Sequence, residues 1–180
     1  MSNSPFLFTI RPYSVADADD VYAAVRESLA DLGLWMPWAH KGYQRHESET
    51  WLAARQPEWD AGVAYEFAII DQLDGSYVGG CGVNQIRPVI QTGNIGYWVR
   101  SSRTRQGAAS QAARWVAEFA FAELGLTRVE IVAAVGNMAS QRAAEKAGAM
   151  REGVLRNRLL LGDEPVDAVL YSLVPDDLGI

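Results

Sequence analysis

The sequence predicts an α/β fold of the α+β type, with a mixed, mainly antiparallel sheet and helices on both of its faces. Strand-like and helix-like segments follow one another along the chain. Two pairs of strand-like segments are joined by short turns, at Asp74-Gly75 and at Gly162-Asp163, as is typical of antiparallel hairpins. The 180 residues, 49% of them hydrophobic, fit one domain with a sizeable core. We therefore expect a single domain over residues 1–180.

The first half of the chain contains three strand patterns and two helix patterns. Ser14 followed by Asp17 resembles a capping box, and apolar residues then recur at helical spacing as far as Leu32. In chain order we predict a strand over 6–11, a helix over 15–32, a Pro-broken apolar loop over 34–38, a helix over 47–59, and hairpin strands over 63–71 and 76–86.

The second half alternates strands and helices before it ends in a hairpin. Gly125 and Gly148 each stand where a helical pattern stops, a common place for glycine. In chain order we predict a strand over 94–100, a helix over 107–124, a strand over 127–135, a short helix over 140–147, and strands over 150–161 and 166–174.

Composition excludes several classes of protein. A formal charge of −6 argues against general nucleic-acid binding, which needs clustered Lys and Arg. No apolar run is long enough to cross a bilayer, and the N-terminal residues lack the features of a signal peptide. Cys81 is the only cysteine, and His40 and His46 have no partner at metal-ligand spacing, so we expect no disulfide and no metal site. The cytoplasm is the expected location.

The junction between the strand over 94–100 and the next helix has the features of a phosphate site. Arg103 and Arg105 precede Gly107, and small residues follow at the start of the helix. The N-terminus of a helix offers unpaired backbone N–H groups to an anion, and a glycine lets the anion come close. The alternative is a short loop whose glycine is needed only for its backbone angles.

A second junction follows the strand over 127–135. Asn137 and Ser140 lie where that strand ends and the next helix begins, which brings an amide and a hydroxyl to the same edge of the sheet. The alternative is structural, because both residue types favour turns and helix caps.

With these two junctions the chain resembles the GNAT superfamily of N-acetyltransferases and, within it, the RimJ/RimL group that acetylates protein N-termini. The resemblance covers nearly the whole chain. Its main motifs are the Trp35-Met36-Pro37-Trp38 segment, the strand Asn94-Ile95-Gly96-Tyr97-Trp98-Val99, the loop Gln106-Gly107-Ala108-Ala109, and the stretch from Asn137 and Ser140 to Glu145-Lys146-Ala147-Gly148.

The resemblance implies a V-shaped split between the central strands, which end at Arg100 and Val135, with acetyl-CoA as cosubstrate in the split. Backbone groups of the first strand and the amide of Asn137 would hold the pantetheine arm, and the amides of the next loop would hold the pyrophosphate. The residues expected to contact acetyl-CoA are Trp98, Val99, Arg100, Arg105, Gln106, Gly107, Ala108, Ala109, Ser110, Asn137 and Lys146. Arg105 departs from the family pattern, which usually has glycine there.

The resemblance also suggests the catalytic groups. Many superfamily members use a tyrosine as the acid seven residues after the asparagine, but Ala144 stands there, so Ser140 is expected to protonate the leaving thiolate. Glu66 is the candidate base because it lies on the strand face opposite the larger apolar residues. Asp167 is its rival. Trp35 and Trp38 are expected to shape the acceptor pocket, with core packing as the alternative.

Three functions remain open on the sequence alone. The first is acetyl-CoA-dependent acetylation of a protein N-terminal α-amine by direct attack in a ternary complex. The second keeps this chemistry with a small amine as acceptor, such as an amino-acid derivative, a polyamine or an antibiotic. The third is a non-catalytic acyl-CoA-binding module. None involves nucleic acid or a membrane, and the resemblance makes a homodimer an expectation.

Overall fold

The computed structural model describes residues 7–180, so Phe6, at the start of the first predicted strand, lies outside the described residues. The strands are β1 (Phe8–Pro12), β2 (Tyr65–Asp71), β3 (Tyr77–Arg87), β4 (Thr92–Val99), β5 (Arg128–Ala134), β6 (Met150–Leu161) and β7 (Glu164–Leu173). The α-helices are α1 (Ala18–Leu32), α2 (Arg45–Ala53), α3 (Arg55–Asp60), α4 (Ala108–Ala122), α5 (Met138–Ala147) and α6 (Pro175–Leu178). Short 3-10 helices span Val15–Asp17, Pro88–Ile90 and Ser101–Arg103.

The seven strands form one sheet in the order β1-β2-β3-β4-β5-β7-β6. The pair β4–β5 is parallel and the other neighbouring pairs are antiparallel, which confirms the mixed, mainly antiparallel sheet. A parallel pair needs a long crossover, and α4 supplies it between β4 and β5.

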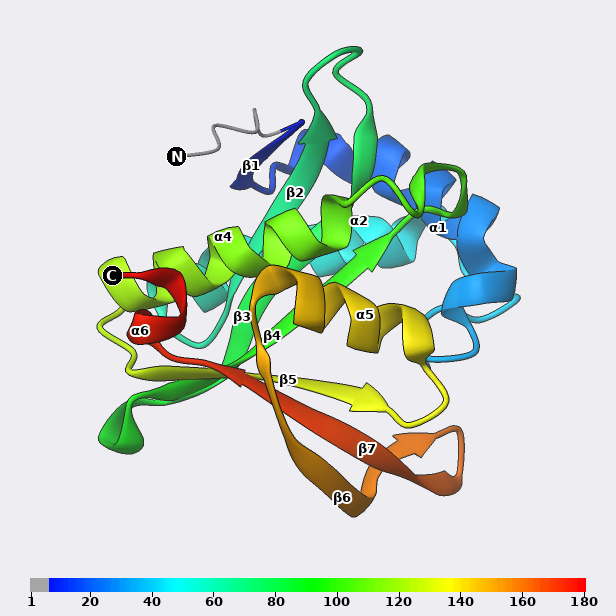
Figure 1. Ribbon diagram of the computed structural model, residues 1–180. Coiled ribbons are helices and arrows are strands. Elements are labelled where there is room, and N and C mark those ends of the chain that lie inside the picture. Colours follow the sequence, from blue (N-terminus) through cyan, green and yellow to red (C-terminus); the bar gives the residue numbers. More distant parts are fainter. Residues whose placement is uncertain (1–6) are drawn as a thin grey trace.

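The two central strands diverge after three paired residues. Thr92, Gly93 and Asn94 of β4 pair with residues 128–130 of β5, and the remaining residues of β4 pair with β3 alone. Figure 1 shows β4 and β5 side by side at their first residues and spreading apart toward the right of the view. This divergence is the V-shaped split that the resemblance implies, and it leaves one edge of β4 open.

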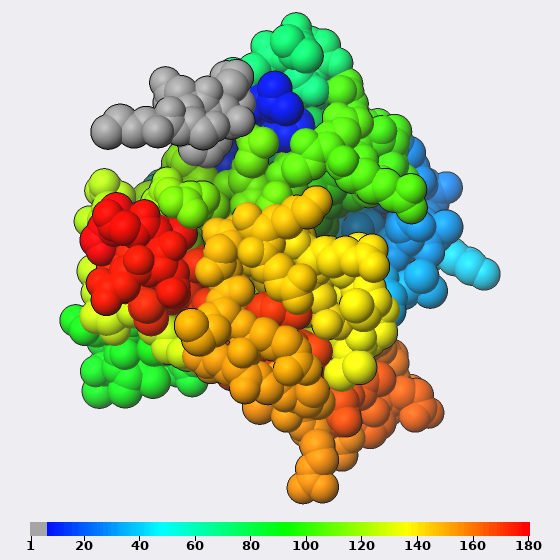
Figure 2. Space-filling view, viewed as in Figure 1, coloured from blue at the N-terminus to red at the C-terminus, as the bar shows by residue number. Residues whose placement is uncertain are grey.

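Helices cover both faces of the sheet, as predicted. In Figures 1 and 2, α4 and α5 lie side by side over one face, and Figure 1 shows α1 and α2 behind the sheet. Alanines and valines of α4 and α5 pack with alternate residues of the strands, among them Phe67 and Val83, in the larger core. Val21 and Val25 of α1 pack with Leu52, Ala68 and Tyr77 in a smaller core on the other face.

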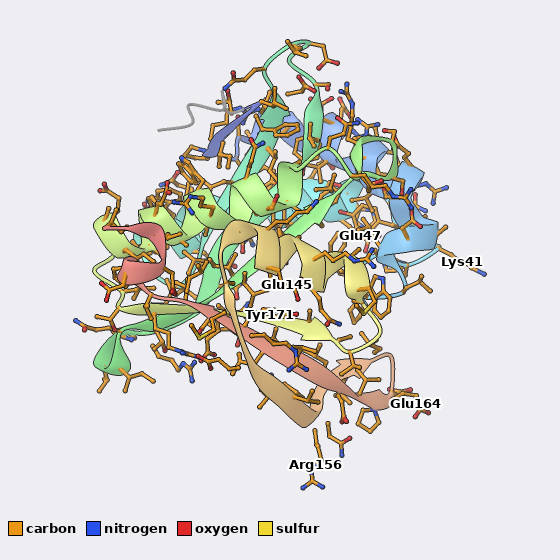
Figure 3. All side chains as sticks on the ribbon, in the orientation of Figure 1. Lys41, Glu47, Glu145, Arg156, Glu164 and Tyr171 are labelled. Atoms are coloured by element: carbon orange, nitrogen blue, oxygen red, sulfur yellow. The ribbon has the colours of Figure 1, made fainter. Side chains whose placement is uncertain are left out.

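A partly buried contact joins α5 to β7, the strand next to β5. The hydroxyl of Tyr171, on β7, donates a hydrogen bond to Oε1 of Glu145 over 2.9 Å, and both side chains are labelled in Figure 3. Tyr171 is fully buried, so this bond satisfies a polar group that would otherwise be costly in the core. The hydrogen bond helps to fix the position of α5 on the sheet.

The predicted helix over 47–59 is wrong in one respect, because it is two helices. α2 ends at Ala53 and α3 begins at Arg55. Pro57 explains the break, since it lacks the N–H that would bond to the carbonyl of Ala53 and its ring would collide with that carbonyl. The short α6 was not predicted.

No helix among residues 7–180 combines the length and the apolar character needed to cross a bilayer.

Candidate active site

The open edge of β4 presents the main-chain groups of alternate residues. The N–H of Arg100 donates to the carbonyl of Val78 on β3 over 2.9 Å, and its carbonyl accepts from the N–H of Arg103 over 3.0 Å. Main-chain groups alternate between the two edges of a strand, so Trp98 also faces β3, whereas Tyr97 and Val99 face the split. Of the backbone groups predicted to hold the pantetheine arm, that of Val99 lies on the open edge, whereas those of Trp98 and Arg100 face β3. The backbone of Tyr97 also lies on the open edge.

The start of α4 is free to bind an anion. Within residues 7–180, the backbone N–H groups of residues 105–110 have no protein acceptor, and Gln111 is the first to bond, to the carbonyl of Gly107. The loop turns into the helix through two left-handed residues, Arg105 with a φ of 64° and Gly107 with a φ of 88°. Arg105 thus adopts the conformation that glycine would adopt more cheaply.

Of the three arginines near this loop, Arg105 is the one available to an anion. Arg100 pairs with Glu27, and Arg103 pairs with Asp71 over 2.9 Å and also with Asp74. Arg105 is exposed and makes no ion pair within the described part of the chain. Its charge stands beside the free amides of the α4 N-terminus.

The N-terminus of α5 is capped by Asn137, so the hydroxyl of Ser140 is not needed as a cap. Oδ1 of Asn137 accepts from the N–H of Ser140 over 3.0 Å, so Asn137 caps the helix and only its amide nitrogen remains without a bond among the described residues. The side chain of Ser140 does not cap the helix. Its Oγ lies 3.2 Å from the hydroxyl of Tyr97 instead.

Tyr97 links β4 to α5 across the split, and sequence reasoning did not assign it a role. Its hydroxyl donates to the carbonyl of Ser140 over 2.8 Å, which leaves its oxygen free to accept from Ser140 Oγ. Burial raises the pKa of Tyr97 to about 12, so the phenol stays neutral at physiological pH. A tyrosine on the apolar face between Ile95 and Val99 was the signal in the sequence, because a buried phenol needs a partner.

A pocket of about 430 Å³ opens on the other face of β4, under α1, α2 and the loop that joins them. Glu66 stands on its floor, and backbone of Gly96 and Tyr97 forms the side nearest the split. Its walls are largely aromatic and include Trp38, which the sequence assigned to the acceptor site.

Two glycines leave the face of the sheet between Glu66 and the edge of β4 without side chains of its own. Glu66 on β2 is paired with Gly82 on β3, which is paired with Gly96 on β4. The carboxylate lies over Gly82, where a Cβ would overlap it. Neighbouring strands are about 4.8 Å apart, so the carboxylate over Gly82 lies about one strand spacing from Gly96 of β4. Ser140 meets Tyr97 on the opposite face, so a carboxylate and a hydroxyl lie on the two faces of the sheet near adjacent residues of β4.

Two asparagines hold the carboxylate of Glu66 in this row. Nδ2 of Asn84 lies 3.4 Å from Oε1 of Glu66, and Nδ2 of Asn94 donates to Oδ1 of Asn84 over 3.1 Å. Burial raises the pKa of Glu66, and the contact with Asn84 opposes that shift. A carboxylate with a raised pKa beside a pocket is the arrangement expected of a general base.

The remaining predicted residues lie at the edge of the site or outside it. Trp35 does not line the pocket but packs on the β5–α5 turn, where a Cβ on Gly136 would come within 3.3 Å of its ring. Asp167 is exposed and accepts from the N–H of Asn157 over 2.8 Å, so it is not a rival base in this pocket. Lys146 is exposed in the last turn of α5, at the end away from Asn137, so the structure does not bring it to the split.

Within residues 7–180, no three His, Cys, Asp or Glu side chains gather as metal ligands. His40 bonds to Glu47 over 3.0 Å, and Cys81 is buried in the sheet, where burial raises its pKa well above the ordinary range. Both residues line the pocket.

Residues 8–150 match the acetyltransferase (GNAT) domain family. YdaF of Bacillus subtilis, provisionally named a ribosomal N-acetyltransferase, is 30% identical over 176 residues, which are 92% of this chain and 90% of that protein. The ribosomal-protein-serine acetyltransferase of Escherichia coli is 34% identical over 100 residues, 55% of each chain. A Vibrio cholerae structure, provisionally named a ribosomal-protein-serine acetyltransferase, is 29% identical and superposes over 95% of each chain with a TM-score of 0.82.

Proposed function

The chain belongs to the acetyltransferase (GNAT) domain family, and from this premise we propose that it transfers an acetyl group from acetyl-CoA to the α-amine of a protein N-terminus. One observation carries the proposal. Glu66 lies over Gly82 in the same cross-strand row as Gly96 of β4, and Ser140 contacts the next residue of β4, Tyr97, on the opposite face of the sheet.

The split and the α4 N-terminus together suit acetyl-CoA. The free amides of residues 105–110 and the charge of Arg105 match a pyrophosphate, which binds well at a helix N-terminus. The open edge of β4 at Tyr97 and Val99, with the free amide nitrogen of Asn137, suits the amide groups of a pantetheine arm. The protein supplies these contacts and orients the thioester toward the pocket.

The acid and base take complementary parts in amide formation. The amine nitrogen forms a bond to the thioester carbon, the carbon–sulfur bond breaks, and the amine loses a proton. Glu66 accepts that proton from the pocket side and later releases it to solvent. Ser140 passes its hydroxyl proton to the departing thiolate from the α5 side and regains one from water. Tyr97 holds Ser140 in place through the contacts at 2.8 and 3.2 Å. Positioning both substrates at one edge supplies much of the rate.

The names of the relatives favour a protein acceptor. The E. coli and V. cholerae proteins are named for ribosomal-protein-serine acetylation, and YdaF is named for a ribosomal substrate. A small amine is the second candidate, because a pocket of about 430 Å³ is within the usual size for small-molecule sites. A non-catalytic CoA-binding module would not need a carboxylate held over Gly82 by two asparagines.

Thiol release separates these functions. Purified protein is mixed with acetyl-CoA and with either N-terminal peptides or small primary amines, and free thiol is followed with time. Release stimulated by peptides supports the proposed function, and release stimulated only by small amines supports the second candidate. CoA binding without release in either panel would leave the binding module as the function.

Arg105→Ala should weaken CoA binding by about three- to tenfold, because an exposed charge near a phosphate gives a modest, salt-dependent gain. Arg105→Lys keeps the charge and should bind nearly as well as the wild type. Titration calorimetry at low and high salt measures the difference. Equal affinity of the alanine variant at low salt would show that Arg105 does not face the pyrophosphate.

Gly96→Ala should fold normally and lose most acetyl transfer. The added Cβ meets only Nδ2 of Asn84, at 3.8 Å, so the sheet tolerates it. The methyl group stands between Glu66 and the open edge of β4, where the acceptor nitrogen has to lie. We expect kcat/KM for the acceptor to fall by about 100-fold, with CoA affinity and the melting temperature unchanged. Full activity in this variant would place the acceptor elsewhere.

A further inference from the structure

The acceptor pocket has aromatic walls on several sides. The rings of Trp38 and Trp98 meet edge to face with their centroids 5.8 Å apart, and Trp38 lies 6.3 Å from Tyr43. Trp51 packs edge to face on Tyr13 at 4.9 Å. These rings come from β4, α2, the strand end after β1 and the loop between α1 and α2, so the walls are held by the fold and not by one flexible segment.

Aromatic side chains pack directly onto the glycines of β3 at the floor of the pocket. A Cβ on Gly80 would overlap the hydroxyl of Tyr13 and come within 2.9 Å of Nε1 of Trp98. The hydroxyls of Tyr13 and Tyr77 bond to each other over 2.7 Å. The floor beside Glu66 therefore consists largely of aromatic rings held close to the sheet.

The charged groups of the pocket are acidic or neutralised. Among the described residues that line it there is no lysine and no arginine. The carboxylate of Glu47 is already bonded to His40 over 3.0 Å and to the N–H of Gln44 over 2.7 Å. Arg55 lies 4.3 Å from the ring of Trp51, does not line the pocket, and pairs with Glu58 over 2.9 Å. A carboxylate next to the acceptor amine would meet no cation here.

We propose that the acceptor is a primary amine whose adjoining group is large and apolar, best an aromatic ring, and which carries no carboxylate beside the nitrogen. The inference rests on the proposed function and narrows its substrate class. The amine reaches Glu66 and Gly96, and the apolar group lies between Trp38, Trp51 and Tyr43. A bulky first residue of a peptide and a free arylalkylamine share this chemistry.

A serine-sized first residue does not fill this space. Burying a phenylalanine-sized side chain is worth roughly 10- to 100-fold in affinity over leaving it exposed, and edge-to-face contacts with the walls add to this. A free amino acid would have to desolvate its carboxylate in a pocket that faces it with Glu66, which is unfavourable. The size of the pocket and its charge thus both favour an amine with a large apolar group and no carboxylate.

Matched acceptors test both parts of the proposal. Acetylation is measured by mass spectrometry with alaninamide, phenylalaninamide, phenylalanine and phenethylamine, and with two peptides that differ only in a first residue of serine or phenylalanine. We expect kcat/KM at least tenfold higher for phenylalaninamide than for alaninamide, and at least tenfold higher than for phenylalanine. The two peptides should show the same order. Comparison of kcat/KM for phenethylamine with kcat/KM for the phenylalanine peptide shows whether the preferred acceptor is a small amine or a protein N-terminus.

Two variants locate the selectivity. Trp38 is 42% exposed, so Trp38→Ala should fold and should reduce the preference for phenylalaninamide over alaninamide by at least threefold. Leu34→Ala, in the same loop and outside the pocket lining, is the matched control and should leave the preference unchanged. Equal loss of preference in both variants would mean that the loop as a whole, and not the ring of Trp38, is responsible.

Binding and turnover separate the inference from the proposed function. Binding of phenylalaninamide is followed independently by quenching of tryptophan fluorescence. Saturable binding without acetylation would contradict the proposed function and leave the pocket assignment standing. Acetylation of alaninamide or the serine peptide as fast as the phenylalanine compounds would overturn the inference and leave the function intact, and absence of both binding and acetylation would overturn the inference as well.

Discussion

Glu66→Gln is expected to lower kcat/KM for the acceptor by about 100-fold or more, because general base catalysis contributes roughly 10²- to 10⁴-fold. The glutamine keeps the shape of the side chain over Gly82 and can keep a bond to Asn84. It cannot accept the proton of an ammonium group. The measurement is steady-state acetyl transfer by the wild type and by Glu66→Gln at saturating acetyl-CoA.

The pH profile gives the same variant a sharper test. Burial raises the pKa of Glu66, and Arg55 and Glu58 of α3 act on it in opposite directions. The base must be ionised, so wild-type kcat/KM should rise with pH through this raised pKa and level off before the acceptor amine titrates. In Glu66→Gln the rise should instead follow the free α-amine, near pH 8. An unchanged profile would remove Glu66 from catalysis.

Stability provides the control for Glu66→Gln. A carboxyl whose folded pKa is raised stabilises the protein at low pH and loses that contribution as pH rises through the folded pKa. Glutamine has no such loss, so at neutral pH the variant should be at least as stable as the wild type. Glu49→Gln, at an exposed site on α2, is the matched control and should leave activity unchanged.

Ser140→Ala should lower kcat by about 100-fold with CoA affinity unchanged, toward the low end of general acid catalysis because a thiolate is a good leaving group. Asn137 caps α5, so the loss of this hydroxyl leaves the cap in place. Calorimetry for CoA binding and a thermal melt check that the site and the fold are intact.

Ser140→Thr and Tyr97→Phe separate the roles of the two hydroxyls. Threonine keeps an Oγ and should recover much of the lost kcat. Tyr97→Phe removes the contacts to Ser140 at 2.8 and 3.2 Å, and should lower kcat by a smaller factor without shifting the pH profile. Ser140→Ala with wild-type kcat would show that water or another group protonates the thiolate.

Local pattern predicted a large part of the fold. Alternation along β2 placed Glu66 opposite Phe67 and Ile69, and the structure puts these two in the larger core and Glu66 in the pocket. The hairpin turns and the end of α5 at Gly148 depend on neighbouring residues alone, so they were accessible to sequence reasoning. The helix predicted to stop at Gly125 ends earlier, because α4 stops at Ala122.

Features made by distant contacts were not accessible in the same way. Tyr97 meets Ser140 across 43 positions of sequence, and the choice between Val99 and Arg100 depends on which edge of β4 pairs with β3. Arg105 departs from the family pattern, and only the structure shows that it takes a left-handed φ of 64° in place of glycine. Pro57 was visible in the sequence, and its effect on the helix over 47–59 was underestimated.

The most direct test of the central claim is mass spectrometry of an amine acceptor incubated with acetyl-CoA and the protein. The wild type should add one acetyl group to the acceptor nitrogen, while the double variant Glu66→Gln/Ser140→Ala binds CoA normally and acetylates at least 100-fold more slowly. Acetylation at the same rate by the double variant would contradict the claim that β4, Glu66 and Ser140 form the catalytic site.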